Sequence, residues 1–330
     1  MSVIRKIGFV FVLMLGFLSP AQNEKTLTHK NKTAFTVALD GSGDFKSIQE
    51  AINQCQSFPY EMISIFIKNG IYKEKIKIHE WNTNLHLIGE SKENTIITFD
   101  DHFKKMGLGR NSTFFTFTLL VEANDVMLKN LTIENSSGDV GQAIALSVTS
   151  NRVAVVNCKL LGHQDTLYAS GTGKQYYKNC HIEGTTDFIF GSATAYFENC
   201  DIHSKSNSFV TAASTPENAE FGFVFNACRF TATAGLAEVY LGRPWRIYAK
   251  TVILNSELGA QITPEGWHNW SKPEVEQTAF YAEYQNSGAG SKLETRVKWA
   301  QKLSKKQAKK YTIQNILRTS DSKTPWYENL

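Results

Sequence analysis

Short runs in which apolar and polar residues alternate recur along most of the chain. The first lie at residues 63–72, 75–80, 85–90 and 95–100, and similar runs continue from residue 113 to about residue 256. This alternation, together with many β-branched and aromatic residues, is typical of β-strands. No helical patterns of about 10–15 residues separate the runs, which argues against a doubly wound α/β sheet.

An Asn-centred segment recurs five times and sets the period of the chain. Its copies are KNLTIEN (129–135), VNCKLLG (156–162), KNCHIEG (178–184), ENCDIHS (198–204) and FNACRFT (225–231), with Asn at positions 130, 157, 179, 199 and 226. A period of 20–27 residues suits a parallel β-helix with three short strands per turn. Asn tolerates left-handed backbone at turns and can form ladders between turns, so we expect a structural role for these residues.

Helical patterns mark both ends of this predicted solenoid. Apolar residues recur at helical spacing over residues 47–55, and Ser47 can cap the helix that would cover the first turn. The Lys-rich segment 302–310 is either a basic patch or, as we favour, the solvated face of a helix near the C-terminus. Because no linker interrupts the middle, we predict one all-β domain, a parallel β-helix, over residues 22–330.

Residues 1–21 have the pattern of a signal peptide. Arg5 and Lys6 precede a 12-residue apolar run at residues 7–18, and small residues follow at 19–21. The run is too short to span a bilayer, which takes about 20 residues. We therefore expect an exported protein, secreted or periplasmic. No Cys follows the run, so we expect no membrane anchor.

The overall charge is close to neutral. The formal net charge is +4, and removal of the two bases in residues 1–21 leaves +2. This balance gives no reason to expect nucleic-acid binding.

Four of the five cysteines belong to the repeat. Cys158, Cys180, Cys200 and Cys228 follow its Asn positions, and their spacing matches no zinc motif. Cys180 and Cys200 fall on consecutive turns, so they could form a disulfide, which export would permit. A ladder of small buried thiols is the alternative, and the sequence leaves both open.

Two aspartates occupy the same place in the repeat. Asp165 lies eight residues after Asn157, and Asp187 lies eight residues after Asn179. In a solenoid, equal register means vertical stacking, about 4.8 Å apart. The count therefore predicts two carboxylates facing each other on the outside of the coil.

Other polar residues could complete a catalytic site around this pair. Gln142 and Gln164 are also 22 residues apart. An insertion between Asn130 and Asn157 makes the stacking of the two glutamines less secure than that of the two aspartates. Two amide donors beside two carboxylates could stabilise a developing oxyanion. Arg243 in LGRPW could keep one carboxylate ionised. Three aromatic residues could offer flat faces to sugar rings: Trp245, Phe190 and Tyr168.

Several ordered motifs carry a family resemblance. They are GSGDFKSIQEAI (41–52), GQAIAL (141–146), GHQDTLY (162–168), GTTDFIFG (184–191), YLGRPW (240–245), GW (266–267) and FYAEYQNSGAG (280–290). In these segments, which span roughly residues 35–300, the chain resembles the pectin methylesterases, carbohydrate esterases that demethylate pectin. The resemblance implies a right-handed parallel β-helix. Two segments depart from the family pattern, 109–118 and 210–215, and both are candidates for lining subsites.

The resemblance also implies a role for each candidate residue. Asp187 would be the nucleophile, and Asp165 the general acid and then the base. Arg243 would orient Asp187. The amides of Gln142 and Gln164 would be the oxyanion donors. Trp245 would line the sugar cleft, with Phe190 and Tyr168 helping to line it.

The expected reaction is hydrolysis of the C6 methyl esters of polygalacturonate through an acyl-enzyme, giving methanol and free carboxylates. The expected partner is methyl-esterified pectin (homogalacturonan), bound by a monomer, and the chemistry requires neither a cofactor nor a metal. Paired aspartates on a β-helix could instead hydrolyse glycosidic bonds. A lyase would need a Ca²⁺-binding acidic cluster, which we do not find around Asp165 and Asp187. A non-catalytic pectin-binding solenoid is the third alternative.

Overall fold

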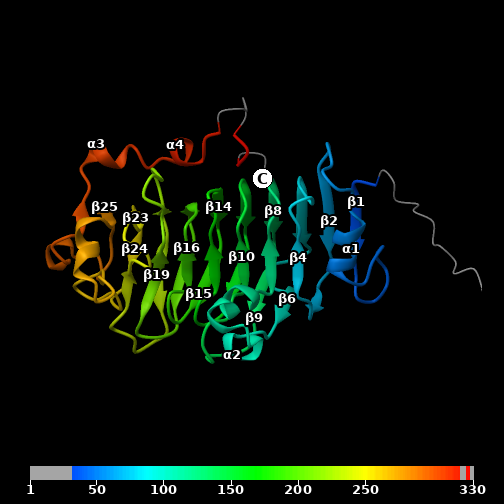
Figure 1. Cartoon of the computed structure of the whole chain (residues 1–330), viewed down its shortest axis with the longest axis horizontal. Helices are drawn as coiled ribbons and strands as arrows, with labels where there is room; N and C mark the ends of the chain where they lie inside the picture. Colours follow the sequence, from blue (N-terminus) through cyan, green and yellow to red (C-terminus); the bar gives the residue numbers. More distant parts are fainter. Residues whose placement is uncertain (1–31, 320–324, 328–330) are drawn as a thin grey trace, which may run out of the picture. The chain divides into compact units, whose positions relative to one another are not determined.

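The computed structural model describes residues 32–319 and 325–327, and three parallel sheets dominate them (Figure 1). Sheet A contains β1 (Ala34–Val37), β2 (Ile63–Ile67), β5 (Leu85–Gly89), β8 (Val126–Lys129), β11 (Val153–Val156), β14 (Lys174–Lys178), β17 (Thr194–Glu198), β20 (Phe223–Asn226), β23 (Lys250–Leu254), β25 (Phe280–Tyr284) and β26 (Gln301–Lys302). Sheet B contains β3 (Gly70–Tyr72), β6 (Thr95–Phe99), β9 (Thr132–Asn135), β12 (Lys159–Leu161), β15 (His181–Gly184), β18 (Asp201–Ser204), β21 (Arg229–Ala232) and β24 (Glu257–Leu258). Sheet C contains β4 (Ile76–Ile78), β7 (Leu119–Val121), β10 (Leu146–Val148), β13 (Leu167–Ala169), β16 (Ile189–Gly191), β19 (Phe209–Ala213) and β22 (Tyr240–Gly242). The predicted right-handed parallel β-helix is confirmed.

Equivalent residues of neighbouring coils stack inside this β-helix. In sheet A, Val155 pairs with Tyr177, Tyr177 with Phe197, and Phe197 with Phe225. The ring centroids of Tyr177 and Phe197 are 4.6 Å apart, and those of Phe197 and Phe225 are 4.4 Å apart, with nearly parallel planes. All four side chains are buried. Because each buried side chain of this size stabilises the fold by about 1.5–3 kcal/mol, such stacks fix the register of the coils.

The turn from sheet A to sheet B uses the repeated Asn, with one correction. Asn130, Asn157, Asn179 and Asn199 have φ between 51° and 56°, the left-handed backbone that Asn tolerates. In the next coil Ala227 takes this position, with φ 53°. Asn226 was predicted to hold it, but one extra residue makes Asn226 the last member of β20, paired with Glu198.

The cysteines in this region are free thiols. All five cysteines of the chain are buried and unbridged. The Sγ of Cys180 contacts the carbonyl oxygen of Val155 at 3.3 Å, and that of Cys200 contacts the carbonyl oxygen of Tyr177 at 3.5 Å. Of the two alternatives, the structure therefore has the thiol ladder.

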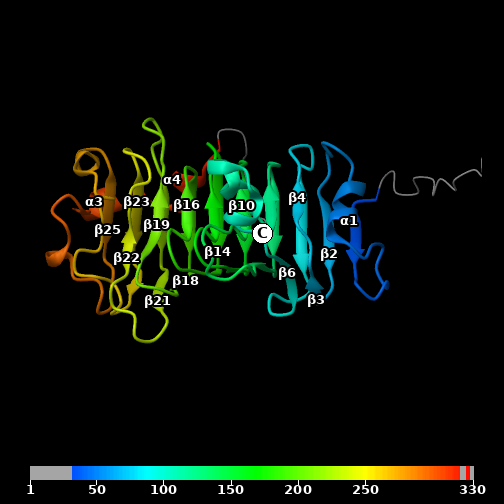
Figure 2. The ribbon, with the colours of Figure 1, turned by 60° about the horizontal axis from the view of Figure 1, so that its bottom comes forward.

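Short helices cover the ends and one face of the β-helix. Helix α1 (Ile48–Gln54) buries its apolar side against the first coils, and Ser47 accepts a hydrogen bond from the Glu50 N–H at 3.3 Å. Helix α3 (Lys305–Ala308) buries no residue, as expected of a solvated Lys-rich segment. Helix α4 (Ile313–Leu317) packs on β14 and β17. Helix α2 (Phe103–Met106) and the 3₁₀ helix η1 (Gly109–Phe115) stand in front of β10 in Figure 2. Two further 3₁₀ helices are η2 (Pro273–Gln277) and η3 (Leu293–Thr295).

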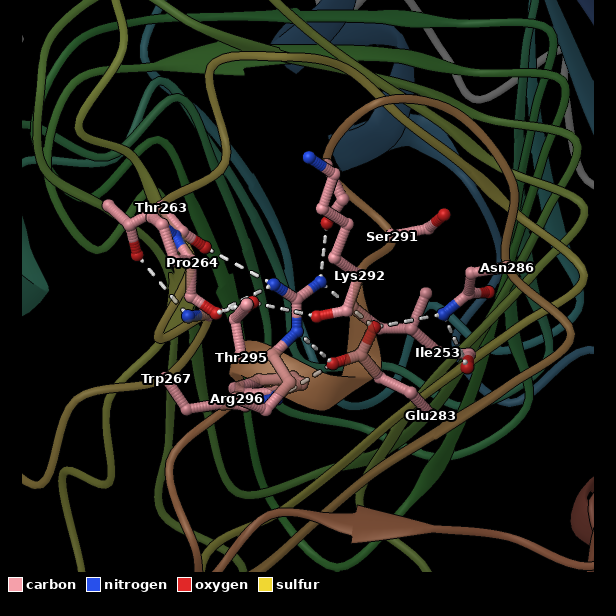
Figure 3. A network of polar contacts seen from close by, with 12 residues as sticks. Ile253, Thr263, Pro264, Trp267, Glu283, Asn286, Ser291, Lys292, Thr295 and Arg296 are labelled. Atoms are coloured by element: carbon pink, nitrogen blue, oxygen red, sulfur yellow. Dashed lines mark hydrogen bonds and ion pairs between the residues drawn. The ribbon is translucent and has the colours of Figure 1, made fainter.

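A buried ion pair joins the last coil to the segment that follows it (Figure 3). Glu283 accepts hydrogen bonds from Arg296 at 2.7 and 3.3 Å. Trp267 Nε1 and Asn286 Nδ2 donate to the same carboxylate at 3.2 and 3.3 Å. Arg296 also donates to the carbonyl of Thr263 at 3.2 Å. The charges are thus removed from water with their hydrogen-bonding capacity used.

Residues 1–31, including the predicted signal peptide 1–21, lie outside the described residues. Within the part of the chain that is described, every helix is too short or too polar to cross a bilayer.

Candidate active site

The two aspartates lie in neighbouring turns between sheets B and C. Each stands two residues before a paired strand residue, Asp165 before Leu167 and Asp187 before Ile189. The N–H of Asp187 donates to the carbonyl of Phe209, one coil further on, at 2.8 Å. Counting along the repeat therefore identified two residues in equal register.

Both aspartates have unusual backbone geometry. Asp165 has φ 69° and Asp187 has φ 51°. Left-handed backbone is uncommon in residues other than Gly and concentrates at functional sites. Both side chains are nevertheless almost fully buried. The fold thus holds two carboxyl groups in strained, mostly dry positions.

A cavity of about 520 Å³ opens over this pair. Seven of the eight candidate residues border it: Gln142, Gln164, Asp165, Asp187, Phe190, Arg243 and Trp245. The eighth, Tyr168, lies beside the cavity, with its ring centroid 4.7 Å from that of Phe190. Tyr168 therefore supports the aromatic wall and does not border the cavity.

Arg243 makes a bidentate ion pair with Asp187. Its Nε donates to Oδ1 at 2.9 Å and its Nη2 to Oδ2 at 2.7 Å. Such parallel hydrogen bonds fix orientation as well as charge. The side chains of Arg243 and Asp187 are 18% and 8% exposed, so water screens their attraction weakly.

The environment separates the pKa values of the two carboxyl groups. Burial raises the pKa of Asp165 well above its ordinary value, and the charge of Asp187 raises it further, against a lowering by Arg243. Burial also raises the pKa of Asp187 above its ordinary value, and the hydrogen bonds and the charge of Arg243 offset part of this rise. We conclude that Asp187 ionises before Asp165, because Arg243 is hydrogen-bonded to Asp187 and acts on Asp165 only through its charge.

The backbone of neighbouring coils holds the two glutamines in adjacent positions. The N–H of Ala143 donates to the carbonyl of Gln164 at 3.0 Å, and the N–H of Phe103 donates to the carbonyl of Gln142 at 2.9 Å. The insertion between the first two Asn positions therefore does not separate the glutamines. Their amides border the cavity that the two carboxyl groups share.

The structure adds residues that the sequence did not identify singly. Segment 109–118, a candidate for lining subsites, contributes Arg110, Asn111, Thr113 and Phe114, and segment 210–215 contributes Ala212. Arg246 and Trp270 were missed. Trp270 follows the GW motif by three residues, and this second Trp was the signal available.

Comparison with known proteins gives the family of this chain. The family model described as pectinesterase matches residues 34–320. The chain belongs to the pectinesterase family. It is 36% identical over 298 residues to pectinesterase 31 of Arabidopsis thaliana, which covers 88% of this chain and 93% of that protein.

Two further similarities differ in how much of each protein they cover. The chain is 38% identical over 276 residues to pectinesterase/pectinesterase inhibitor U1 of Solanum lycopersicum, covering 80% of this chain and 46% of that protein. It thus spans about half the length of several curated relatives that it matches. The solved structure of a pectin methylesterase from carrot has a TM-score of 0.80 and 33% identity, covering 86% of this chain and 92% of that one.

Proposed function

We propose that this protein hydrolyses the C6 methyl esters of galacturonate in pectin and releases methanol. The observation that carries the proposal is one cavity holding two buried carboxyl groups, of which only Asp187 is bonded to an arginine. Such a pair provides an ionised nucleophile beside a protonated acid. Membership of the pectinesterase family supports the same reaction.

In the first half of the reaction, a carboxylate oxygen of Asp187 attacks the ester carbonyl carbon. The negative charge moves to the carbonyl oxygen, where the amides of Gln142 and Gln164 can donate hydrogen bonds. The bond to the methoxy group then breaks, and Asp165 gives its proton to the departing oxygen. Methanol leaves, and Asp187 remains joined to the sugar as an acyl-enzyme.

In the second half, the roles of Asp165 reverse. Now a carboxylate, it takes a proton from a water molecule whose oxygen attacks the acyl carbon. The bond to Asp187 breaks, which releases the C6 carboxylic acid, returns Asp187 to its carboxylate form and leaves Asp165 protonated. The released acid then loses its proton to solvent and becomes the free carboxylate. The sum is one ester and one water converted into one acid and one methanol.

The walls of the cavity suit an acidic polysaccharide. Phe190 and Trp245 offer apolar faces for sugar rings, and their ring centroids lie 5.9 Å apart. Arg110 and Arg246 border the same cavity and can attract carboxylates of residues that are already demethylated. We further propose that the protein is exported, on the pattern of residues 1–21.

The test is methanol release from highly methylated pectin by wild type and Asp187→Ala. We expect kcat/KM of the variant to fall by ~10⁴-fold or more, while binding to methylated pectin survives. The matched control is Asp201→Ala, which removes an exposed carboxylate paired with Arg229 on sheet B and should release methanol at the wild-type rate.

Three outcomes would contradict the proposal. New reducing ends without methanol would indicate a glycoside hydrolase. Absorbance from an unsaturated sugar would indicate a lyase. Tight binding of wild type to pectin with no product would indicate a binding module.

A further inference from the structure

The guanidinium of Arg243 contacts two aromatic rings. Its Cζ is 4.0 Å from the ring centroid of Phe209 and 3.7 Å from that of Trp270. The same guanidinium makes both hydrogen bonds to Asp187. A flat cation that contacts two rings and makes two hydrogen bonds to one carboxylate has little freedom to rotate or tilt.

An unusual backbone conformation and several hydrogen bonds fix the position of Trp270. Its backbone is left-handed, with φ 57°, which a bulky residue rarely adopts. Its N–H donates to Nδ1 of His268 at 2.9 Å, and the N–H of His268 donates to the carbonyl of Gly242 at 3.1 Å. Three residues earlier, Trp267 is tied to the buried carboxylate of Glu283 (Figure 3). Strain that is held by this many contacts indicates a required position.

Phe209 reaches Arg243 from another element and from outside the catalytic cavity. It pairs with Tyr240 between β19 and β22, and the two rings stack with centroids 5.3 Å apart. The ring of His268 lies 5.4 Å from that of Phe209. Phe209 borders a neighbouring cavity of about 390 Å³ and is not among the residues around the catalytic one. The side chain of Phe209 therefore reaches the site through Arg243, while its backbone carbonyl, which a side-chain substitution keeps, accepts from the Asp187 N–H.

We propose that Phe209 and Trp270 are positioning residues that clamp the guanidinium of Arg243 in the plane that gives Asp187 both of its hydrogen bonds. This inference rests on the proposed function, because it assigns a purpose to the ionised form of Asp187. The rings also keep water from the parts of the guanidinium that they contact, and the Arg243 side chain is only 18% exposed, so its charge acts on Asp187 with weak screening.

The charges around the clamp determine the direction of the expected effect. Asp187 faces Arg243 and Asp165, and its charge also reaches the buried Tyr281. Burial and then the charge of Arg243 lower the pKa of His268, which favours the neutral ring whose Nδ1 accepts from the Trp270 N–H. Arg243 is the group that lowers the pKa of Asp187. If a ring is lost and the guanidinium moves, the pKa of Asp187 rises and a higher pH is needed to ionise it.

The experiment measures kcat and KM against pH on short methylated oligogalacturonates. For Phe209→Leu we expect the acid limb of kcat/KM to move up by roughly 0.5–1 pH unit and kcat at pH 6 to fall by roughly 10-fold. KM should change by less than about twofold, because Phe209 does not border the substrate cavity. Phe209→Tyr keeps an aromatic ring at this position and should show the same dependence of kcat and KM on pH as wild type.

A second pair of variants covers the case in which Phe209→Leu does not fold. Trp270→Leu should shift the acid limb in the same direction and Trp270→Phe should not, although KM can change in both because Trp270 borders the cavity. An acid limb that stays in place in the folded Leu variants would overturn the clamp. If wild type releases no methanol, the proposed function fails separately. The clamp is then tested by NMR titration of the Asp187 carboxyl in wild type and Phe209→Leu, where an unchanged pKa would overturn it.

Discussion

Asp187 with Arg243 and Glu283 with Arg296 are two mostly buried pairs in which one guanidinium donates two hydrogen bonds to one carboxylate. The second pair is the more enclosed, with side chains 4% and 1% exposed against 18% and 8%. Chemically the pairs are the same, so the differences around them show what turns an ion pair into a reactive site.

The first difference is how fully the carboxylate is used. Each oxygen of Glu283 accepts a second hydrogen bond, one from Trp267 and one from Asn286. Asp187 instead borders a cavity and lies near Asp165, whose pKa its charge raises. A saturated carboxylate has no lone pair left for an incoming ester, whereas Asp187 keeps one side open to substrate.

The second difference is the backbone. Glu283 sits in the regular strand β25, and Asp187 sits in a turn with φ 51°. The strand places its side chain inside the coil, where all partners come from the protein. The turn places its side chain at the outer edge, where a partner can come from solution. Strain at the turn is therefore tolerated for reactivity, while the end of the β-helix is built for stability.

The substitution Asp165→Asn should have opposite effects on activity and on stability, and these are the largest effects that we expect. Asn cannot supply the proton for methanol, so we expect kcat/KM to fall by ~10²–10⁴-fold. Folding raises the pKa of Asp165, so the folded state holds this proton more tightly than the unfolded state does. Above the unfolded pKa of about 3.9 the unfolded state gains by releasing the proton, and the folded state therefore loses stability as the pH rises. Asn removes this loss, and the free energy of unfolding at pH 7 should rise.

Methanol release and urea unfolding measure the two effects on one preparation. Glu283→Gln is the matched control, since it makes the same change of acid to amide in the saturated pair and should lower the free energy of unfolding. A less stable Asp165→Asn protein would contradict the idea that the catalytic carboxyl costs stability.

Arg296→Met should have the next largest effect, and on stability alone. Removing one partner leaves the buried charge of Glu283 uncompensated, which typically costs about 3–5 kcal/mol of unfolding free energy. The folded variant should keep kcat/KM within about threefold. The control is Lys68→Met, which breaks an ion pair with Glu90 whose side chains are 53% and 43% exposed, and should cost less than about 1 kcal/mol. Equal costs in the two variants would show that burial does not distinguish the pairs.

The equal register of the two aspartates could be predicted from the sequence because their coils are regular. Leu167 pairs with Ile189, a step of 22 residues, and the same step separates Asp165 from Asp187. In a parallel β-helix, residues separated by the same step as the paired strands occupy equivalent positions, so the count placed the two aspartates in equal register. For the glutamines the count is one residue off, because Leu146 pairs with Leu167, a step of 21 residues, whereas Gln142 and Gln164 are 22 apart.

Counting fails where coil lengths change. Asn226 pairs with Leu254, and Leu254 with Tyr284, so successive steps differ and long loops lie between the strands. Phe209 in β19 and Trp270 in a later loop both contact Arg243, and no spacing in the sequence indicates that they do. The pair of Glu283 and Arg296 could not be recognised in the sequence for another reason. Glu and Arg are common on protein surfaces, and only the structure shows that these two are buried.

The smallest effect on stability is expected at Glu183, which forms a partly exposed ion pair that can be compared with the two buried pairs. Its side chain is 23% exposed and accepts hydrogen bonds from His181 and Lys205, both at 3.1 Å. The bond from His181, followed by the bond and charge of Lys205, lowers its pKa from 4.5 to about 2, against a rise from burial. This stabilisation is present above pH 4.5 and is lost as the pH falls through about 2. After allowance for screening by water it amounts to roughly 2 kcal/mol.

In urea unfolding between pH 5 and 2, the stability difference between wild type and Glu183→Gln should therefore shrink steadily as acid is added. A difference that stays constant over this range would mean that the ion pair contributes nothing, and that only the enclosed pairs of this fold carry electrostatic stability.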